Sequence, residues 1–203
     1  MKIGILGSGN IGGTLGKKWA QAGHDVVFGV REVNSAKVGA LLEAAGGNAS
    51  ADSVANAAAF GDVILIAIPW SAAGAMVEAH AEALNGKIVM DATNNFGGPV
   101  INNVEAISSN APAARVYRAF NSLGWENFET PQIGETQVDL FYCGPDDEAR
   151  PVVEGLIQEI GLRPIWVGDL DVVQIVDSIG LLWVSLIFGQ GMGRHLAFKV
   201  LTP

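Results

Sequence analysis

Short apolar runs alternate with amphipathic segments along the first half of the chain. The apolar runs predict strands at residues 2–6, 25–30, 62–68 and 87–91. The segments between them carry apolar side chains at helical spacing, which predicts helices at residues 11–22, 36–45, 53–60 and 73–84. The run DVILIAI at 62–68 is almost wholly apolar, so we expect a central strand buried on both faces. This alternation is typical of a parallel sheet covered by helices.

The second half of the chain follows a looser pattern. Residues 91–99 (DATNNFGGP) gather turn-forming side chains, and another loop is expected from Asn121. We predict strands at residues 115–120, 138–143 and 163–167. We predict helices at residues 100–109, from a cap at 145–147 to about 160, and 170–190. The Ala-rich stretch 49–59 fits a packed helix, and no linker or repeat divides the chain.

Composition and charge narrow the classes of protein that this chain can represent. Its 203 residues are 49% hydrophobic and 16% charged, the reverse of a disordered chain. The net charge of −9 disfavours nucleic acid and anionic membranes as partners. The longest apolar stretch, residues 179–188, is about half of what a bilayer needs, so we expect a buried helix. The first residues lack a signal-peptide pattern, and we expect a cytoplasmic protein.

The residue types that bind metals are scarce and scattered. His24, His80 and His195 are far apart, with no Cys or Glu at ligand spacing, so no metal site is expected. The single cysteine, Cys143, lies inside an apolar strand and is expected to be buried and inert. A single cysteine rules out a disulfide framework and fits a reducing compartment.

A glycine-rich motif, GxGxxG, directly follows the first predicted strand and opens the first helix. Its residues are Gly7, Ser8, Gly9, Asn10, Ile11 and Gly12. In this context Gly7 permits the tight turn, Gly9 lets a pyrophosphate approach the backbone, and Gly12 lets the helix pack on the strand. We therefore predict a dinucleotide site in an α/β protein of the Rossmann type, a doubly wound parallel sheet. We expect one domain, with the Rossmann core at 1–168 and a C-terminal helix and tail at 169–203.

The end of the second strand indicates which dinucleotide is bound. An NAD site usually places Asp or Glu there for the ribose 2′-hydroxyl, but this chain has Val30 and Arg31. A guanidinium without a carboxylate favours the 2′-phosphate of NADP(H). The alternative is that Arg31 merely solvates a loop, with Glu32 as its salt-bridge partner.

Three later strand ends supply further candidates, because ligands of such sheets lie outside the carboxyl ends of the strands. Ile68, Pro69 and Trp70 follow one strand, where Trp70 offers a flat apolar wall. Asn94 and Asn121 follow the next two, and their amides could orient a carboxamide or a ring edge. The alternatives remain open: Trp70 packs in the core, and the two asparagines are turn formers.

Several longer segments together resemble one known family over essentially the whole chain. They are GSGNIGGTLGKKWAQAGHDVVFGVR, VILIAIPW, DATN, RAFNSLGWENF, CGPDDEAR, LIQEIGLRPIWVGDL and GMGRHLAFKVL. The chain resembles the NADPH-dependent coenzyme F-420 reductases, also called F-420-dependent NADP oxidoreductases. It is also similar to the cytoplasmic domain of metalloreductases that pass electrons from NADPH to a flavin. It departs from the family at Val30, where a Ser or Asn is frequent.

The resemblance implies a homodimer that exchanges a hydride between NADP(H) and a deazaflavin, coenzyme F-420, as the small-molecule co-substrate. It places Gly191, Met192 and Gly193 opposite Trp70 as the far wall of the acceptor site. Arg194, His195 and Lys199 lie nearby in the sequence and are candidate donors to anionic groups of the acceptor; the alternative is a basic helix end that complements the helix dipole. No catalytic acid or base is expected, because hydride transfer between two rings needs mainly alignment. Two alternatives remain: an NADPH-dependent reductase of a free flavin or another acceptor, and an NADP(H)-binding sensor without turnover.

Overall fold

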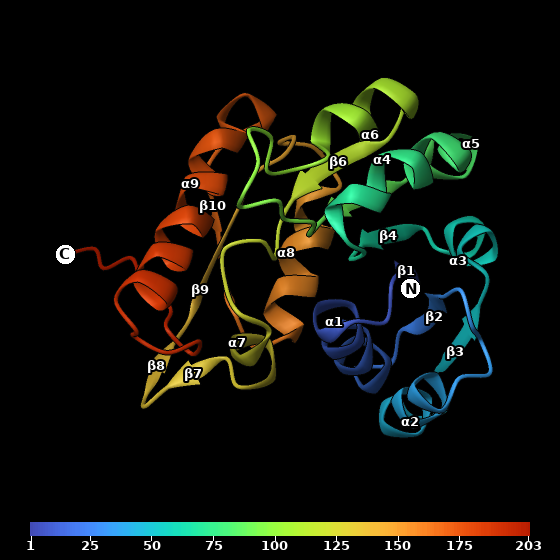
Figure 1. The fold of residues 1–203 in the computed structure, drawn as a ribbon, viewed down its shortest axis with the longest axis horizontal. Coiled ribbons are helices and arrows are strands. Elements are labelled where there is room, and N and C mark those ends of the chain that lie inside the picture. The colour runs from blue at the N-terminus through green and yellow to red at the C-terminus, as the bar shows by residue number, and fades with distance from the viewer.

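The computed structural model describes residues 1–203 and is organised around one six-stranded parallel sheet. The strand order is β3-β2-β1-β4-β5-β6, so the chain starts at the centre and winds outward in both directions (Figure 1). The strands are β1 (Lys2–Leu6), β2 (Asp25–Gly29), β3 (Ala49–Asp52), β4 (Val63–Ile66), β5 (Ile88–Asp91) and β6 (Arg115–Arg118). This is the predicted doubly wound Rossmann-type fold.

Helices cover both faces of the sheet, as its apolar strands require. One face packs on α1 (Asn10–Gln21), α2 (Ala36–Ala45), α7 (Trp125–Glu129), α8 (Arg150–Glu159) and α9 (Val173–Val184). The other packs on α3 (Val54–Phe60), α4 (Trp70–Ala79), α5 (Ala81–Leu84) and α6 (Val104–Asn110). All four residues of β4 are buried, which confirms the central strand predicted from its apolar run.

The Ala-rich stretch 49–59 departs from the prediction in its first residues. Ala49–Asp52 form the edge strand β3 and pair in parallel with β2, and the helix begins only at Val54. Ser53 separates the two elements because its side chain accepts a hydrogen bond from the Asn56 amide and so starts α3. The alanines alone carried no periodicity that could distinguish a short edge strand from the helix after it.

The region after β6 contains more regular structure than the predicted loop. It holds α7 and a small hairpin of β7 (Gln132–Ile133) and β8 (Thr136–Gln137). The predicted strands at 138–143 and 163–167 appear as β9 (Asp139–Tyr142) and β10 (Arg163–Trp166), which pair with each other rather than with the main sheet. An isolated bridge between Arg118 and Cys143 links the two sheets.

Helix boundaries in this region also differ from the sequence prediction. α6 begins at Val104 rather than near residue 100. α8 begins at Arg150, since Asp147 binds the Ala149 amide in the turn before the helix. At the start of α6, Asn102 Oδ1 likewise accepts from the Val104 amide. Polar residues in tight turns satisfy backbone amides much as a helix cap does, which accounts for both displaced starts.

The predicted long apolar helix at 170–190 consists of a 3₁₀ turn η1 (Leu170–Val172), α9, and a π-helical turn η2 (Ser185–Gly189). One face packs on the core through Val176, Trp183 and Ile187. The opposite face leaves large apolar side chains exposed: Ile175, Leu181, Leu182 and Phe188. The expectation of a buried helix is therefore correct for one face only.

Residues Leu170–Gly189 are also long and apolar enough to cross a membrane, judged by length and composition alone. Helices that pack in the cores of soluble proteins meet the same two criteria, so this property is weak evidence for a membrane span.

Candidate dinucleotide site

The glycine loop has the geometry that its motif predicts. Gly7 turns the chain out of β1 with φ +115°, a conformation that side chains rarely adopt. Gly9 precedes α1, and a Cβ built there meets nothing within 4 Å. A Cβ at Gly12 would collide with the carbonyl oxygen of Gly7. Gly9 therefore faces open space that a ligand can occupy, whereas Gly12 is required for packing inside the loop.

The start of α1 leaves its backbone amides available to an anion. No side chain caps this helix, and its first turn carries no acidic residue. The first N–H groups of a helix have no partner within it, and they lie at the positive end of its dipole. A phosphate group placed over Gly9 would accept hydrogen bonds from these amides without a competing carboxylate.

A cavity of about 630 Å³ opens beside this loop, within the size range of cofactor sites. The predicted residues that line it are Gly7, Ser8, Gly9, Arg31, Ile68 and Pro69. The other lining residues are Gly29, Val30, Glu32, Ser35, Lys37, Val38, Val54, Ala67, Ala72 and Met76. The cavity thus connects the carboxyl ends of β1, β2 and β4, where a Rossmann fold binds its dinucleotide.

Two cations in this cavity are free of internal partners. Arg31 is exposed and forms no ion pair, so the alternative of a salt bridge with Glu32 is not what the structure contains. Lys37, in the first turn of α2, lines the same cavity and is likewise unpaired. The sequence prediction missed Lys37. The sequence feature that could have indicated Lys37 is its position just after Ser35. Ser35 caps α2 and so positions the first turn of that helix against the cavity.

A second cavity, of about 240 Å³, lies on the other side of the loop and is lined by Ser8, Gly9 and Asn10. Lys17 and Glu129 form a salt bridge at its wall, with 2.7 Å between Nζ and Oε1. Lys37 and Trp125 complete the part of the wall nearest α2 and α7. Ile11 and Gly12 line neither cavity, which fits their place behind the loop.

Three of the later strand-end candidates, Trp70, Asn94 and Asn121, lie outside both cavities. Trp70 is the first residue of α4, half-buried, and its Nε1–H donates to the Asn102 carbonyl at 3.1 Å. Asn94 Oδ1 accepts from Arg118, and Asn94 Nδ2 donates to the Asn121 carbonyl at 3.3 Å. Asn121 is 2% exposed. Its Nδ2 donates to Asp177 Oδ1, whereas its Oδ1 is buried without a partner. Both asparagine side chains thus bind other residues of the chain, but Asn121 does so only through its nitrogen.

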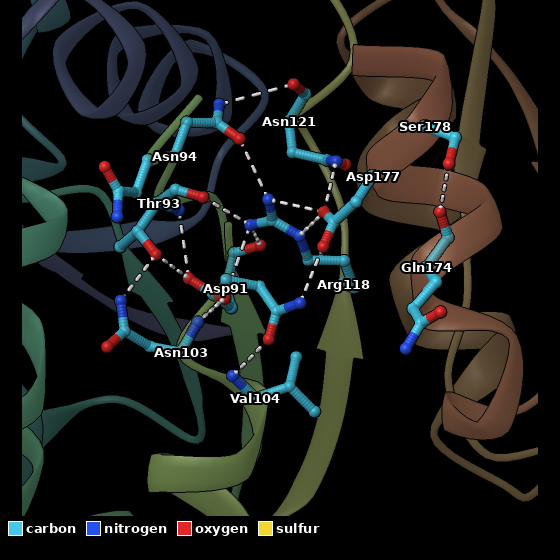
Figure 2. A network of polar contacts seen from close by, with 12 residues as sticks. Asp91, Thr93, Asn94, Asn103, Val104, Arg118, Asn121, Gln174, Asp177 and Ser178 are labelled. Carbon is cyan, nitrogen blue, oxygen red and sulfur yellow. Dashed lines mark hydrogen bonds and ion pairs between the residues drawn. The ribbon is translucent and has the colours of Figure 1, made fainter. Parts of the chain in front are cut away.

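The polar centre of this region is a buried arginine that sequence reasoning missed. Arg118, at the end of β6, is fully buried and contacts Asp91 and Asp177, which are buried too (Figure 2). Thr93 and Asn103 complete the hydrogen bonds of Asp91. The available signal was a charged residue at each end of the short strand RVYR, but the sequence does not tell which of the two is buried.

The predicted far wall of the acceptor site also lies outside the two cavities. Gly191 and Gly193 have φ of +68° and +82°, and Met192 is exposed between them. The three candidate donors beyond this turn are already bound within the chain. Arg194 pairs with Glu126, His195 contacts the Thr130 carbonyl, and Lys199 pairs with Asp139. These contacts attach the tail to α7 and β9.

Cys143 is buried, as predicted. Burial raises the pKa of its thiol to about 12, with nearby Asp177 and Asp169 acting in the same direction and Arg118 against it. The protonated thiol is a poor nucleophile, so Cys143 has no part in the chemistry of this site.

Comparisons with known proteins agree with this geometry. Residues 2–95 match the family model described as NADP oxidoreductase, coenzyme F420-dependent. The F420-dependent NADP reductase of Methanothermobacter thermautotrophicus is 26% identical over 208 residues, which cover 92% of this chain and 89% of that protein. The rat metalloreductase STEAP3 is 29% identical over 185 residues, but the chain spans only 36% of its length.

A similar solved structure is a putative F420-dependent NADP reductase from Arthrobacter sp. FB24, with a TM-score of 0.87, 25% identity and full coverage of both chains. The reductive aminase of Aspergillus terreus, solved with NADPH, has a TM-score of 0.65 at 21% identity; the chain spans 61% of its length. The second likeness shows the shared fold.

Fold, glycine loop and free cations together define an NADP(H)-binding oxidoreductase of the Rossmann class. Within that class, residues 2–95 match the coenzyme F420-dependent NADP oxidoreductase family, and nearly the whole chain is similar to an F420-dependent NADP reductase.

Proposed function

We propose that this protein transfers a hydride between NADP(H) and a deazaflavin of the coenzyme F-420 type. The observation that carries the proposal is the match in length as well as sequence to the methanogen reductase, which covers 92% of one chain and 89% of the other. The similarity to STEAP3 covers only 36% of the length of that protein. The reductases of the same size are thus the better guide to the reaction.

The residues around the larger cavity suit a reaction that depends on alignment. Glycines and apolar side chains form most of its wall, and its charged groups are Arg31, Glu32 and Lys37. No His, Cys or Tyr lines it. NADP(H), when bound, supplies the hydride from its nicotinamide ring. The chain's task is to hold that ring against the acceptor ring at near-attack distance and to exclude water.

The 2′-phosphate of NADP(H) is proposed to bind between Arg31 and Lys37. Both cations line the same cavity and neither has an internal partner. Glu32 lies in the same wall and would repel the phosphate, so we expect it to turn away from the bound ligand. The pyrophosphate is proposed to lie over Gly9, where a Cβ would meet open space.

The acceptor is proposed to bind between Trp70 and the turn formed by Gly191, Met192 and Gly193. Apart from each glycine and its two chain neighbours, no atom lies within 4 Å of a Cβ built at either position, so a flat ring could approach this backbone closely. Since the turn lines neither cavity, the acceptor would contact it from the open surface.

The experiment is a stopped-flow assay of NADPH oxidation with deazaflavin, FMN, FAD and ferric chelates as acceptors. Saturable, stoichiometric reduction of the deazaflavin is the expected result. Brisk reduction of FMN, FAD or ferric chelate without reduction of the deazaflavin would favour a reductase of another acceptor, an alternative that the similarity to STEAP3 motivates. Micromolar NADPH affinity without turnover of any acceptor would favour a sensor.

We also propose a cytoplasmic homodimer that buries the exposed face of α9. Four large apolar side chains on α9 and η2 are 41–69% exposed, namely Ile175, Leu181, Leu182 and Phe188. Exposed apolar patches on this scale mark interaction surfaces. Sedimentation should give a dimer at micromolar concentration and a monomer for Leu182→Glu. The control Ile133→Glu adds the same charge at an exposed apolar residue of β7 and should stay dimeric. A monomeric wild type would contradict the proposal.

A further inference from the structure

The side chain of Arg118 joins α9 to the carboxyl edge of the sheet (Figure 2). Its Nε donates to Asp177 Oδ1 at 2.9 Å, and its Nη2 lies 2.8 Å from the same oxygen. On the other side, Nη1 lies 3.3 Å from Asp91 Oδ2. Both carboxylates are buried, and Arg118 is fully enclosed between them. The guanidinium is thus the central charge of a buried triad that spans β5, β6 and α9.

The same guanidinium also holds the loop that follows β5. Its Nη1 donates to the backbone carbonyls of Asp91 and Thr93, and its Nη2 donates to Asn94 Oδ1 at 2.8 Å. All three nitrogens of the planar group are therefore in use. A lysine in this position could supply the charge but could not supply donors in these directions.

Asp177 also binds the segments around Asn102 and Asn121 at this edge of the sheet. Its Oδ2 accepts from Asn102 Nδ2 at 2.6 Å, and its Oδ1 accepts from Asn121 Nδ2 at 3.2 Å. The carbonyl of Asn102 in turn accepts the indole N–H of Trp70. The sequence offers Trp70 as a flat wall for a bound ring, and Asn94 and Asn121 as contacts for a carboxamide or a ring edge. Each is one or two hydrogen bonds from the ion pair of Arg118 and Asp177.

We infer that Arg118 and Asp177 are positioning residues for hydride transfer, which hold the nicotinamide end of the site in place against α9. The inference rests on the proposed function, because it assigns these residues a part in that reaction. None of the residues in this network lines the cavity that holds Gly9 and Arg31. Loss of the network should therefore impair the reactive half of the cofactor site and leave the half that binds adenosine and its phosphates unchanged.

A merely structural role would give a different pattern. A buried ion pair that loses one partner leaves an uncompensated charge, so any change at Arg118 or Asp177 lowers stability. Lower stability alone would not weaken the binding of the nicotinamide half of NADPH while leaving the binding of the adenosine half unchanged. The test therefore needs a probe for each half, namely 2′,5′-ADP for the adenosine half and the fluorescence of bound NADPH for the nicotinamide half.

The variants are Asp177→Asn and Arg118→Lys. Asp177→Asn keeps the shape of the side chain and removes its charge. Arg118→Lys keeps the charge and removes the planar set of N–H donors of the guanidinium. Asn102→Ser is a milder third variant, because it removes one bond to Asp177 and leaves the buried ion pair intact. Leu84→Ala is the control for lost stability. Leu84 is fully buried in α5 and packs in the core on the other face of the sheet.

The first two variants should bind 2′,5′-ADP within twofold of the wild type by calorimetry. Their kcat for NADPH oxidation should fall at least tenfold, and they should lose the fluorescence change of bound NADPH. Asn102→Ser should show the same pattern with a fall of several-fold. Leu84→Ala should melt at a lower temperature with wild-type kcat and fluorescence.

Wild-type kcat and fluorescence in the folded variants would overturn the inference. An equal loss of 2′,5′-ADP affinity would overturn it too. If Asp177→Asn and Arg118→Lys do not fold, Asn102→Ser decides by the same two readouts. If none of the acceptors supports NADPH oxidation by the wild type, the proposed function fails. The fluorescence and 2′,5′-ADP measurements still decide whether the network positions the nicotinamide end.

Discussion

The first half of the molecule and the part that follows β6 use their polar groups in opposite ways. Around Gly9, the start of α1 has no cap, and the cations Arg31 and Lys37 have no internal partners. At the end of β6, Arg118 lies between Asp91 of β5 and Asp177 of α9, and further along the chain the C-terminal tail is bound to Asp139. The first region keeps donors free for a ligand, whereas the second consumes them to hold distant segments together.

This difference separates effects on binding from effects on stability. A polar group that is free in the folded protein contributes little to the fold, and its removal is felt mainly when a ligand is present. A polar group that is buried and paired leaves its partner unsatisfied when it is removed, which costs stability directly.

The largest effect is expected at Gly9. A Cβ at this position meets no protein atom within 4 Å, so Gly9→Val should fold and melt close to the wild type. The valine side chain would occupy the place proposed for the pyrophosphate. We expect the affinity for NADPH, measured by calorimetry or fluorescence, to fall by more than about 100-fold, the loss of several charge-assisted hydrogen bonds.

Gly12→Val provides the contrast within the same loop. Its Cβ would collide with the Gly7 carbonyl and crowd Ile5, so this variant should lose stability as well as NADPH binding. Tight NADPH binding by Gly9→Val would remove the dinucleotide site from this loop.

Arg31 should affect the choice of cofactor more than the stability of the protein. A lost charge-assisted contact costs about 1.5–3 kcal/mol, or roughly 10–150-fold in affinity. Arg31→Ala should lower the affinity for NADPH by this amount and the affinity for NADH far less, because NADH lacks the 2′-phosphate. Lys37→Ala should give a smaller change in the same direction, and its melting temperature should stay unchanged. Equal weakening of NADPH and NADH would show that Arg31 does not read the 2′-phosphate.

The first region was predictable from the sequence because its signals are local. The motif from Gly7 to Gly12 and the strand that ends before Arg31 each define their own geometry within a few residues. The second region depends on contacts between residues far apart in the sequence, such as Arg118 with Asp177, 59 residues away. Asn94 and Asn121 could be placed at the correct edge of the sheet, but their partners could not be predicted from sequence periodicity.

The same limit applies to the secondary structure. β4 was predictable because burial on both faces leaves a continuous apolar run. β3 was not, because an edge strand of four small or polar residues has no such run, and only its pairing with β2 defines it.

A smaller effect, on stability, is expected at Asp139. Burial alone would raise the pKa of this carboxyl, but hydrogen bonds from Arg163, the Val200 amide and Lys199 outweigh burial and lower it. The charged form therefore stabilises the fold above the ordinary carboxyl pKa of about 4, and this contribution is lost as the pH falls through the lowered pKa of the folded state.

Asp139→Asn should reduce the free energy of unfolding by roughly 1.5 kcal/mol at pH 7, the lower end for hydrogen bonds to a charged group, because Arg163 stays partly solvated. Urea unfolding at pH 7 and pH 3 measures the difference between variant and wild type, which should shrink at pH 3. A difference that is the same at both pH values would mean that the carboxylate charge does not hold the tail. NADPH affinity should not change, since Asp139 lines neither cavity.

The smallest effect is expected at Cys143, where burial beside the Arg118 network predicts an absence of reactivity. Its thiol is enclosed beside the Arg118 network, and burial raises its pKa to about 12. At pH 8 the thiolate that reacts with iodoacetamide is therefore almost absent in the folded protein, and the reagent has no access to the sulfur. Labelling followed by mass spectrometry should detect no adduct in the native protein and complete modification in urea. Because Asp177→Asn loosens the contact between α9 and β6, native-state labelling of Cys143 should become measurable in that variant and stay undetectable in Arg31→Ala. Equal protection in both variants would mean that the network around Arg118 is not what keeps this region closed.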